Sequence, residues 1–311
     1  NKDSILIGNS AGDSTMGNSG SRNILLGKES GKLIENGNDN ILVGNSTGIA
    51  LVDNINNILV GNSAGEKLVN NDSVMIGYNS GYNSTKQNLF LGTYSGYNMT
   101  GVNNIILGNN LLNISNISAL VDKNINNNIF IGNDAGIESD GNDNVCIGEG
   151  SGILDTGSRS VSIGNYTTSN NKYSSKDITL QTTGYNVNVG YLAGKELISG
   201  TRSINIGAGA GQKNNQDDNI CIGYKTGNSV TGTKNIFFGN NSGENTNGNN
   251  NIGIGINTLV GLVDDTTIAS DNVSIGYQAG MHIKSNNNIC IGTDSISKYT
   301  IFTLLNFKGT T

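Results

Sequence analysis

The sequence predicts an all-β fold, a parallel β-roll or β-solenoid of about 17 short coils. Three observations indicate it. The motif NILVGNSAG at 57–65 recurs with small variations in 17 copies. Twelve of the 16 gaps between the first glycines of successive copies are 15 to 17 residues long. Each glycine follows a short run of apolar residues, which is typical of a β-strand. We therefore expect one tandem-repeat region over residues 1–297.

Each repeat begins with the expected strand. Counting from the first glycine of the motif as position 0, positions −3 and −1 are apolar in all 17 copies, as in Ile58 and Val60. Alternating apolar residues indicate a strand with one buried face, and β-branched side chains suit a pleated surface. We expect positions −3 and −1 to form the core and position −2 to face outward.

Position −4 is Asn in 13 copies and Ser in the other four. Stacked coils would place these side chains one above another, where amides form hydrogen-bonded ladders. A simpler interpretation is that Asn suits the turn that enters the strand. The two interpretations are compatible, and neither implies catalysis.

Glycines mark the expected corners of each coil. Position 0 is always Gly, position +4 is Gly in 13 copies, and Gly adopts positive φ without steric cost. Position +3 is small in 16 copies. We take the following glycines as representative structural turns: Gly8, Gly44, Gly61, Gly132, Gly148, Gly223 and Gly276.

Four copies lack the glycine at +4 and have Leu112, Thr168, Leu259 or Ile296 there. The first three precede the longest gaps, of 24, 26 and 21 residues. We infer that the +4 glycine makes the tight return to the next coil. Without it the chain makes an insertion, near 112–127, 168–185 and 259–271, and loops of this kind are where receptor binding is expected.

The second half of each repeat has a weaker pattern, with an apolar residue near +7, as in Ile34, Leu51 and Leu68. This pattern predicts a second short strand and a second turn in each coil. Residues 298–311 leave the repeat pattern, and we expect a C-terminal cap or a junction to a following domain.

Position −2 changes character along the chain. It is apolar in the first eight copies and mostly small or polar in the last nine. If this position faces outward, the first eight form a continuous apolar stripe, and such a stripe marks an interface. The predicted oligomer interface consists of Leu6, Leu25, Leu42, Leu59, Met75, Phe90, Ile106 and Phe130.

The tandem pattern N-[IV]-x-[IV]-G-x-x-[AST]-G resembles the head repeats of trimeric autotransporter adhesins and the tail-fibre repeats of phages and viruses. The nearest segments are DNVSIGYQAGM at 271–281 and NNIFIGNDAGI at 127–137, and the resemblance covers about residues 3 to 297. It implies a homotrimer of parallel β-rolls around a long axis, serving as a rigid stalk or adhesive head on a virion or a cell surface. The implied partners are other copies of the chain and a cell-surface receptor or glycan.

Residues with catalytic or metal-binding chemistry are sparse. His282 is the only histidine, and Cys146, Cys221 and Cys290 share position −2 with no CxxC spacing. Adjacent carboxylates occur at 217–218 and 264–265, and we expect adjacent side chains to point apart. We therefore predict no catalytic, cofactor-binding or metal-binding residue and no enzyme, against the alternative of a polysaccharide-degrading tailspike.

Composition disfavours nucleic-acid binding and membrane insertion, and one acidic stretch matches a calcium loop only in part. Only 14% of residues are charged and no basic cluster with interleaved aromatics occurs, so no nucleic-acid partner is expected. No run of 18 apolar residues is present, so we expect no membrane insertion. Asp140, Asn142 and Asn144 alternate as in a calcium loop, but Val145 and Ser151 stand where such a loop needs Gly and Glu.

Overall fold

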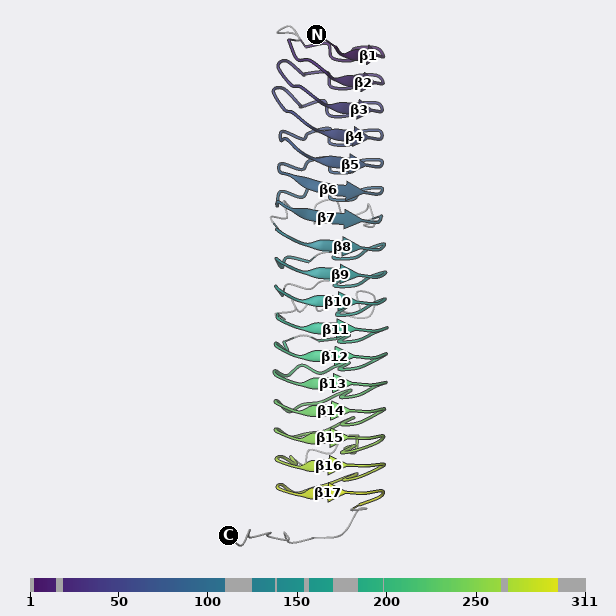
Figure 1. Ribbon diagram of the computed structural model, residues 1–311, viewed down its shortest axis with the longest axis vertical. Helices are drawn as coiled ribbons and strands as arrows, with labels where there is room; N and C mark the ends of the chain where they lie inside the picture. The colour runs from purple at the N-terminus through teal and green to yellow at the C-terminus, as the bar shows by residue number, and fades with distance from the viewer. Residues whose placement is uncertain are drawn as a thin grey trace. The chain divides into compact units, whose positions relative to one another are not determined.

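The computed structural model describes residues 3–14, 19–109, 125–137, 139–153, 157–169, 184–197, 199–263 and 268–295. They form a parallel β-solenoid with 17 strands, and none of them lies in a helix (Figure 1). The chain divides into two compact units, unit 1 over Asn1–Ile153 and unit 2 over Leu154–Thr311. The predicted fold class is confirmed at this level.

Unit 1 is built from nine strands, and each pairs in parallel with the next along the chain. The register places equal motif positions opposite each other, as in Leu42↔Leu59. The strands are β1 (Ile5–Ile7), β2 (Ile24–Leu26), β3 (Ile41–Val43), β4 (Ile58–Val60), β5 (Val74–Ile76), β6 (Asn88–Leu91), β7 (Asn104–Leu107), β8 (Ile129–Ile131) and β9 (Val145–Ile147).

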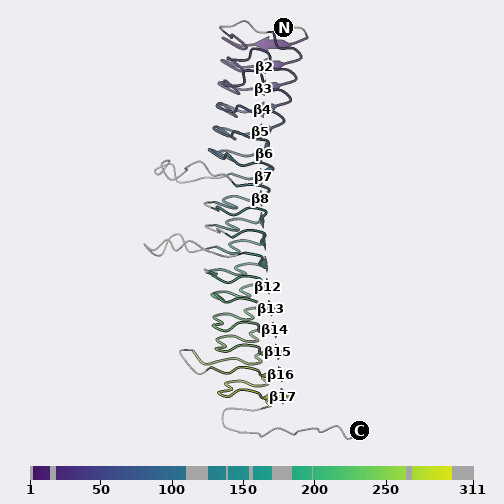
Figure 2. The same ribbon diagram turned by 90° about the vertical axis from the view of Figure 1, so that its left-hand side faces the viewer.

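Unit 2 repeats the same arrangement with eight strands in the same register. In the turned view, the strands of each unit lie along one side of its coils (Figure 2). The strands are β10 (Val161–Ile163), β11 (Val187–Val189), β12 (Ile204–Ile206), β13 (Ile220–Ile222), β14 (Ile236–Phe238), β15 (Ile252–Ile254), β16 (Val273–Ile275) and β17 (Ile289–Ile291).

Each coil contains one strand, whereas the repeat pattern predicted two. The half of the coil that contains position +7 forms turns, not a second strand. The backbone contributes to this, since residues at +6 in several coils, such as Asn98 and Lys213, have φ of +57° and +59° and interrupt an extended run immediately before +7. The +7 side chains Ile34, Leu51 and Leu68 are nonetheless fully buried and form the wall opposite the strand.

The orientation of the strands is opposite to the expectation. Position −2 is buried in 16 of the 17 strands, and Leu6 at the remaining one is partly buried against the core. Positions −3 and −1 face outward instead. The chain returns on the side of position −2, so the glycine at +4 packs against that side chain. A Cβ on Gly96, for example, would lie 2.2 Å from Cε2 of the Phe90 ring.

The glycine at position 0 brings neighbouring coils into close contact. The seven representative glycines have φ between +127° and +141°. A Cβ on Gly61 would lie 2.4 Å from the carbonyl oxygen of Gly77 in the next coil, and Gly77 stands in the same relation to Gly92 at 2.3 Å. A side chain at this position would push the coils apart, which explains why every copy has Gly there.

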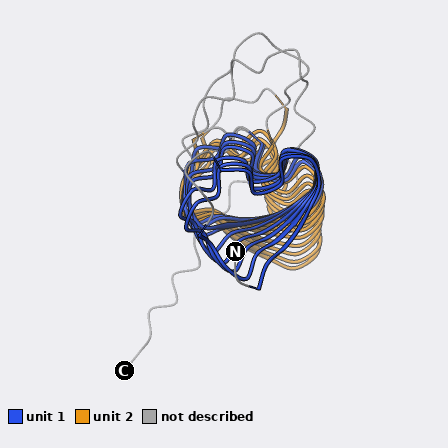
Figure 3. Cartoon of the chain, turned by 90° about the horizontal axis from the view of Figure 1, so that it is seen from above, with its two compact units in different colours: residues 1–153 blue, residues 154–311 orange. Residues whose placement is uncertain are grey.

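The Asn side chains at −4 form the expected ladder inside the fold. Asn57 accepts a hydrogen bond at Oδ1 from the Ser73 backbone N–H, at 3.1 Å, and donates from Nδ2 to Oδ1 of Asn40, at 3.0 Å. Its Nδ2 also donates to the Asn70 carbonyl across the same coil, at 3.0 Å. Viewed from above, the coils of each unit lie one over another with a gradual shift from coil to coil (Figure 3). Each such amide ties its strand both to the neighbouring coil and to the opposite wall.

Candidate functional site

The outward face of the strands is the most uniform surface of the molecule. It carries positions −3 and −1 of 17 strands, which is 34 side chains, and all are Ile, Val, Leu or Phe. None of the 34 is buried. Ile58 is 38% exposed and Ile76 is 40% exposed, although each lies between two neighbouring strands. We call this surface the outer face.

The outer face forms two columns of aliphatic side chains in each unit. The parallel register places −3 against −3 and −1 against −1, as in Ile58↔Val74 and Val60↔Ile76. With a rise of about 3.3 Å per residue and about 4.8 Å between strands, the strip in unit 1 is on the order of 10 Å wide and 40 Å long. An area of roughly 400 Å² is comparable with the largest apolar patch of a typical monomer, a patch that is often functional.

The buried position −2 is far less uniform than the outer face. It ranges in size from Phe90 and Phe237 through Cys221 and Asn205 to Gly253. In most soluble folds the interior is uniformly apolar and the exterior varies. Here the reverse holds across the repeats of one chain: the buried position −2 varies and the outer face is uniformly apolar.

The interior tolerates this range because positions −2 and +4 share one space. Where −2 is Gly253, the +4 residue is Leu259, whose side chain is 5% exposed and lies in the cluster with Cys221, Val230 and Phe237. Where −2 is Ser162, the +4 residue is Thr168, and their hydroxyl groups are 2.7 Å apart. In these two coils a small residue at −2 coexists with a residue larger than glycine at +4, whereas Ser274 at −2 is followed by Gly280 at +4.

The eight residues predicted as an oligomer interface do not lie on the outside. Seven of them are at most 1% exposed and belong to the interior cluster of unit 1, while Leu6 is partly buried against it. These seven are Leu25, Leu42, Leu59, Met75, Phe90, Ile106 and Phe130. The prediction assigned the alternation of the strand to the wrong faces, and the apolar face that is exposed on the strands is the outer face.

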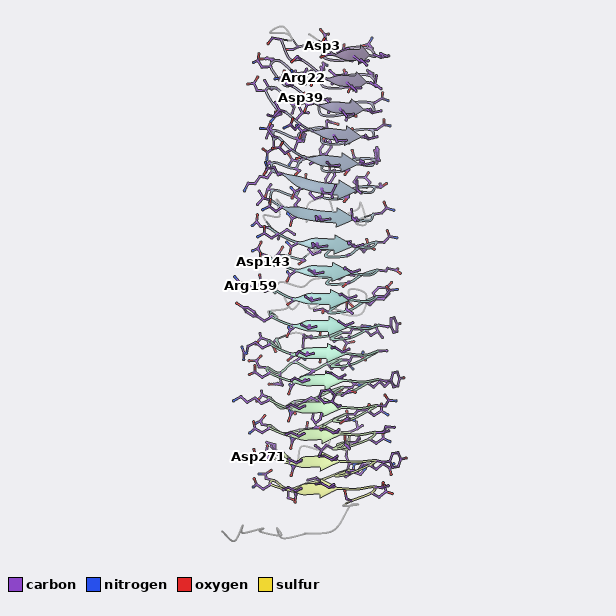
Figure 4. All side chains as sticks on the ribbon, viewed as in Figure 1. Asp3, Arg22, Asp39, Asp143, Arg159 and Asp271 are labelled. Carbon is purple, nitrogen blue, oxygen red and sulfur yellow. The ribbon has the colours of Figure 1, made fainter. Side chains whose placement is uncertain are left out.

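A column of polar and charged residues at −5 borders the outer face where each strand begins. Figure 4 labels Asp3, Arg22 and Asp39 of unit 1 in this column. Arg22 Nε donates to Asp39 Oδ1 at 2.6 Å and Nη2 to Oδ2 at 2.7 Å. The hydrogen bond from Arg22 is the main reason why the pKa of Asp39 lies below its ordinary value. In unit 2, Arg202 and Asp218 form the same pair.

The other residues considered from the sequence lie in structural positions. All three cysteines are buried, and burial raises the pKa of Cys221 to about 12, so its thiol is protonated at neutral pH. Asp217 and Asp218 both contact Arg202. Asn144 is part of the buried ladder, and Asn142 Oδ1 accepts from the Asn126 backbone N–H at 2.7 Å. The backbone of His282 donates to the Val260 carbonyl.

Several predicted features fall partly or wholly outside the described residues. The insertions near 112–127, 168–185 and 259–271 are described only at 125–127, 168–169, 184–185, 259–263 and 268–271. Residues 264–265 and the C-terminal segment 298–311 lie outside them entirely. In the described ranges, no three His, Cys, Asp or Glu side chains are grouped so that they could hold a metal ion. The same ranges contain no helix that is long and apolar enough to cross a membrane.

Comparison with protein-family models gives no match, and neither does comparison with curated protein sequences. The outer face is therefore the feature of the described residues that bears most directly on function. The sequence held one signal that position −2 faces inward. In the coil with Gly253 at −2, the usual glycine at +4 is replaced by Leu259, which is expected if the two side chains share the interior.

Proposed function

We propose that the protein is a structural fibre component that assembles with copies of itself into a rigid homotrimeric rod. The proposed setting is extracellular, on the surface of a virus or phage or, as the alternative, on a bacterial cell as an adhesin head. The observation that supports the proposal is the outer face, where 34 of 34 side chains are aliphatic or Phe and none is buried.

The chemistry of the outer face favours association over exposure to water. A strand face that is exposed to water usually carries polar side chains. A face that carries only aliphatic side chains is usually covered by another part of the fold or by a partner. Burial contributes about 25 cal/mol for each Å² of apolar surface removed from water, and adjacent coils provide that surface without interruption within each unit. In a symmetric oligomer of parallel chains, column −3 of one copy would pack against column −1 of the next.

A competing explanation is that the aliphatic columns stabilise only the stack of coils, by contacts between neighbouring strands. Substitution by Thr separates the two explanations, because Thr keeps the β-branched shape and the strand preference but adds a hydroxyl group. The test variant changes six outer-face residues of unit 1 together, namely Ile41→Thr, Val43→Thr, Ile58→Thr, Val60→Thr, Val74→Thr and Ile76→Thr.

We expect the wild-type protein to sediment as a trimer and the sixfold variant to sediment as a smaller species with the same β-sheet circular dichroism. The matched control is Val52→Thr with Val69→Thr, since both valines are exposed but lie outside the strands. The control should keep the wild-type mass. A wild-type monomer, or a sixfold variant with unchanged mass, would contradict the proposal.

A further inference from the structure

Four of the 11 tyrosines gather on two consecutive coils of unit 1, the coils that contain β5 and β6. These four are Tyr78, Tyr82, Tyr94 and Tyr97, and we call them the tyrosine cluster. All three ring-to-ring contacts among the described residues join members of this cluster. The cluster therefore concentrates phenol groups at one place along the solenoid.

Tyr82 and Tyr97 form the closest pair of the cluster. Both occupy position +5 of their coils, so the stacking of the coils sets one ring over the other. The ring centroids are 5.1 Å apart and the ring planes differ by 10°. This separation is close to the spacing of neighbouring strands, about 4.8 Å, so the two rings face each other without displacement of either coil.

The other two rings connect this pair to the solvent. Tyr78 is 50% exposed, and its ring centroid lies 5.4 Å from that of Tyr94. The Tyr94 centroid lies 5.6 Å from that of Tyr97. Tyr82, Tyr94 and Tyr97 are themselves partly buried. An electron that an oxidant removes at Tyr78 can therefore be replaced from the inner rings through successive ring contacts.

Charged residues of the preceding coil lie against Tyr82. Its hydroxyl group donates to Glu66 Oε1 at 3.4 Å, and Lys67 Nζ lies 4.9 Å from the centroid of its ring. A carboxylate in this place accepts the proton that a phenol releases when it loses an electron. Burial raises the pKa of Tyr97, so this phenol is also protonated at neutral pH and releases a proton on oxidation.

We propose that Tyr82 and Tyr97 are a site of oxidative crosslinking, at which a peroxidase with hydrogen peroxide joins the two side chains as dityrosine. Each phenol loses one electron and its phenolic proton, and the proton of Tyr82 passes to Glu66. The two phenoxyl radicals form one C–C bond between ring carbons ortho to the oxygens. Each of these carbons then releases its hydrogen as a proton while its oxygen takes one up, which restores both aromatic rings.

The overall reaction removes two electrons and two protons from the pair of side chains. One molecule of hydrogen peroxide takes them up and becomes two molecules of water. The product joins two consecutive coils by a covalent bond, beside backbone hydrogen bonds such as that from the Tyr94 N–H to the Tyr78 carbonyl at 2.9 Å. Such a link restricts the unfolded chain, as a disulfide does. Both side chains belong to one copy of the chain, so the inference does not depend on self-association.

Treatment of the full chain with a haem peroxidase and limiting hydrogen peroxide tests the proposal. A denaturing gel separates single chains from chains that are joined to one another, and dityrosine fluorescence is read in the single-chain band. We expect that band to fluoresce, with a yield per chain that is unchanged by tenfold dilution of the protein. Mass spectrometry of peptides from the band should find Tyr82 and Tyr97 joined, with the loss of two hydrogen atoms.

Tyr97→Phe separates crosslinking from aromatic packing, because Phe keeps the ring and lacks only the phenol. This variant should have the wild-type circular dichroism and at least tenfold less dityrosine in the single-chain band. The matched control is Tyr191→Phe with Tyr224→Phe, which removes two exposed phenols of unit 2 and should leave the yield unchanged.

Three results would overturn the proposal. They are a single-chain band of the wild type without dityrosine, a band in which another pair of tyrosines carries most of the crosslink, and a Tyr97→Phe variant with the wild-type yield. A control variant with reduced yield counts as the second of these, because it places the crosslink in unit 2. The molar mass of the untreated protein is measured separately, so none of these results can be confused with a failure of the trimer proposal.

Discussion

Units 1 and 2 present the same outer face but enclose different interiors. In unit 1, position −2 is Leu, Met, Phe or Ile in eight strands, followed by Cys146. In unit 2 the first three strands have Ser162, Asn188 and Asn205 there, all with no exposed surface. Nevertheless the strands, their register and the glycine turns are the same.

The polar interior of unit 2 is made possible by hydrogen bonds between coils. Asn205 Nδ2 donates to Asn188 Oδ1 at 2.8 Å, and Asn188 Nδ2 donates to Thr168 Oγ1 at 2.7 Å. Pairing of this kind offsets the cost of burying the amides, although Asn205 Oδ1 is buried and has no hydrogen-bond partner. The same ladders and glycine turns therefore support coils with different interiors, and the outer face is apolar in both units.

The largest expected difference between the units comes from truncating position −2. Phe90→Ala in unit 1 should lower the free energy of unfolding by about 3–5 kcal/mol, because a fully buried ring is replaced by a cavity. Cys221→Ala at the same slot of unit 2 should cost about 1 kcal/mol, the size of an ordinary substitution. Denaturant unfolding followed by hydrogen exchange in each unit measures both, and equal losses would contradict the difference between the interiors.

The asparagine ladder should matter equally in both units. Asn57→Ala in unit 1 and Asn235→Ala in unit 2 each remove a buried amide that bonds the next coil and the opposite wall. Each should cost about 2–3 kcal/mol, since buried backbone groups lose their partners. The same unfolding measurement applies. A loss confined to one unit would show that the ladder is not the shared support.

The shared space at −2 and +4 predicts a compensated exchange in unit 2. Gly253→Leu alone should destabilise by about 1–3 kcal/mol through overpacking, because a Cβ at Gly253 would already lie 2.8 Å from Ser242 Oγ and 3.1 Å from Phe237 Cδ1, and the glycine that elsewhere makes room at +4 is Leu259 here. Adding Leu259→Gly converts the coil to the pattern of unit 1 and should recover most of the loss. A double-mutant cycle measures the coupling, and additive effects of the two changes would argue against a shared space.

The smallest effect is expected from the charged column at −5. The pKa of Asp39 is lowered chiefly by its hydrogen bond with Arg22, so the pair stabilises the fold at neutral pH. That contribution is lost as the pH falls below the ordinary value of an aspartate and through the lowered pKa. Unfolding curves between neutral and acidic pH should show a slightly weaker acid dependence for Arg22→Gln, and the difference should shrink in salt because both groups are exposed.

The sequence was sufficient to predict the parallel solenoid and an amide ladder at position −4, because the repeat imposes one geometry on every copy. It was not sufficient to orient the strand. In unit 1 all three strand positions are apolar, as in Ile41, Leu42 and Val43, so alternation does not distinguish the two faces. In unit 2, Asn188 and Asn205 at −2 look like surface residues, although each is buried and hydrogen-bonded to a neighbouring coil.

The second half of the coil was mispredicted for a related reason. The apolar residue at +7 correctly indicated burial, as Leu51 and Leu68 show. A single buried residue between turns does not require a strand, and the positive φ of residues such as Lys213 is not encoded by a distinctive residue type. Local sequence therefore predicted which side chain is inside but not the backbone that places it there.

The most direct test of self-association through the outer face is the molar mass of the intact protein in solution. One chain has a mass of 32.4 kDa. Light scattering on the chromatographic peak of the wild type should give three times that mass over a tenfold dilution. A mass of one chain at every concentration would contradict the account, because the outer face would then remain exposed to water along all of its strands.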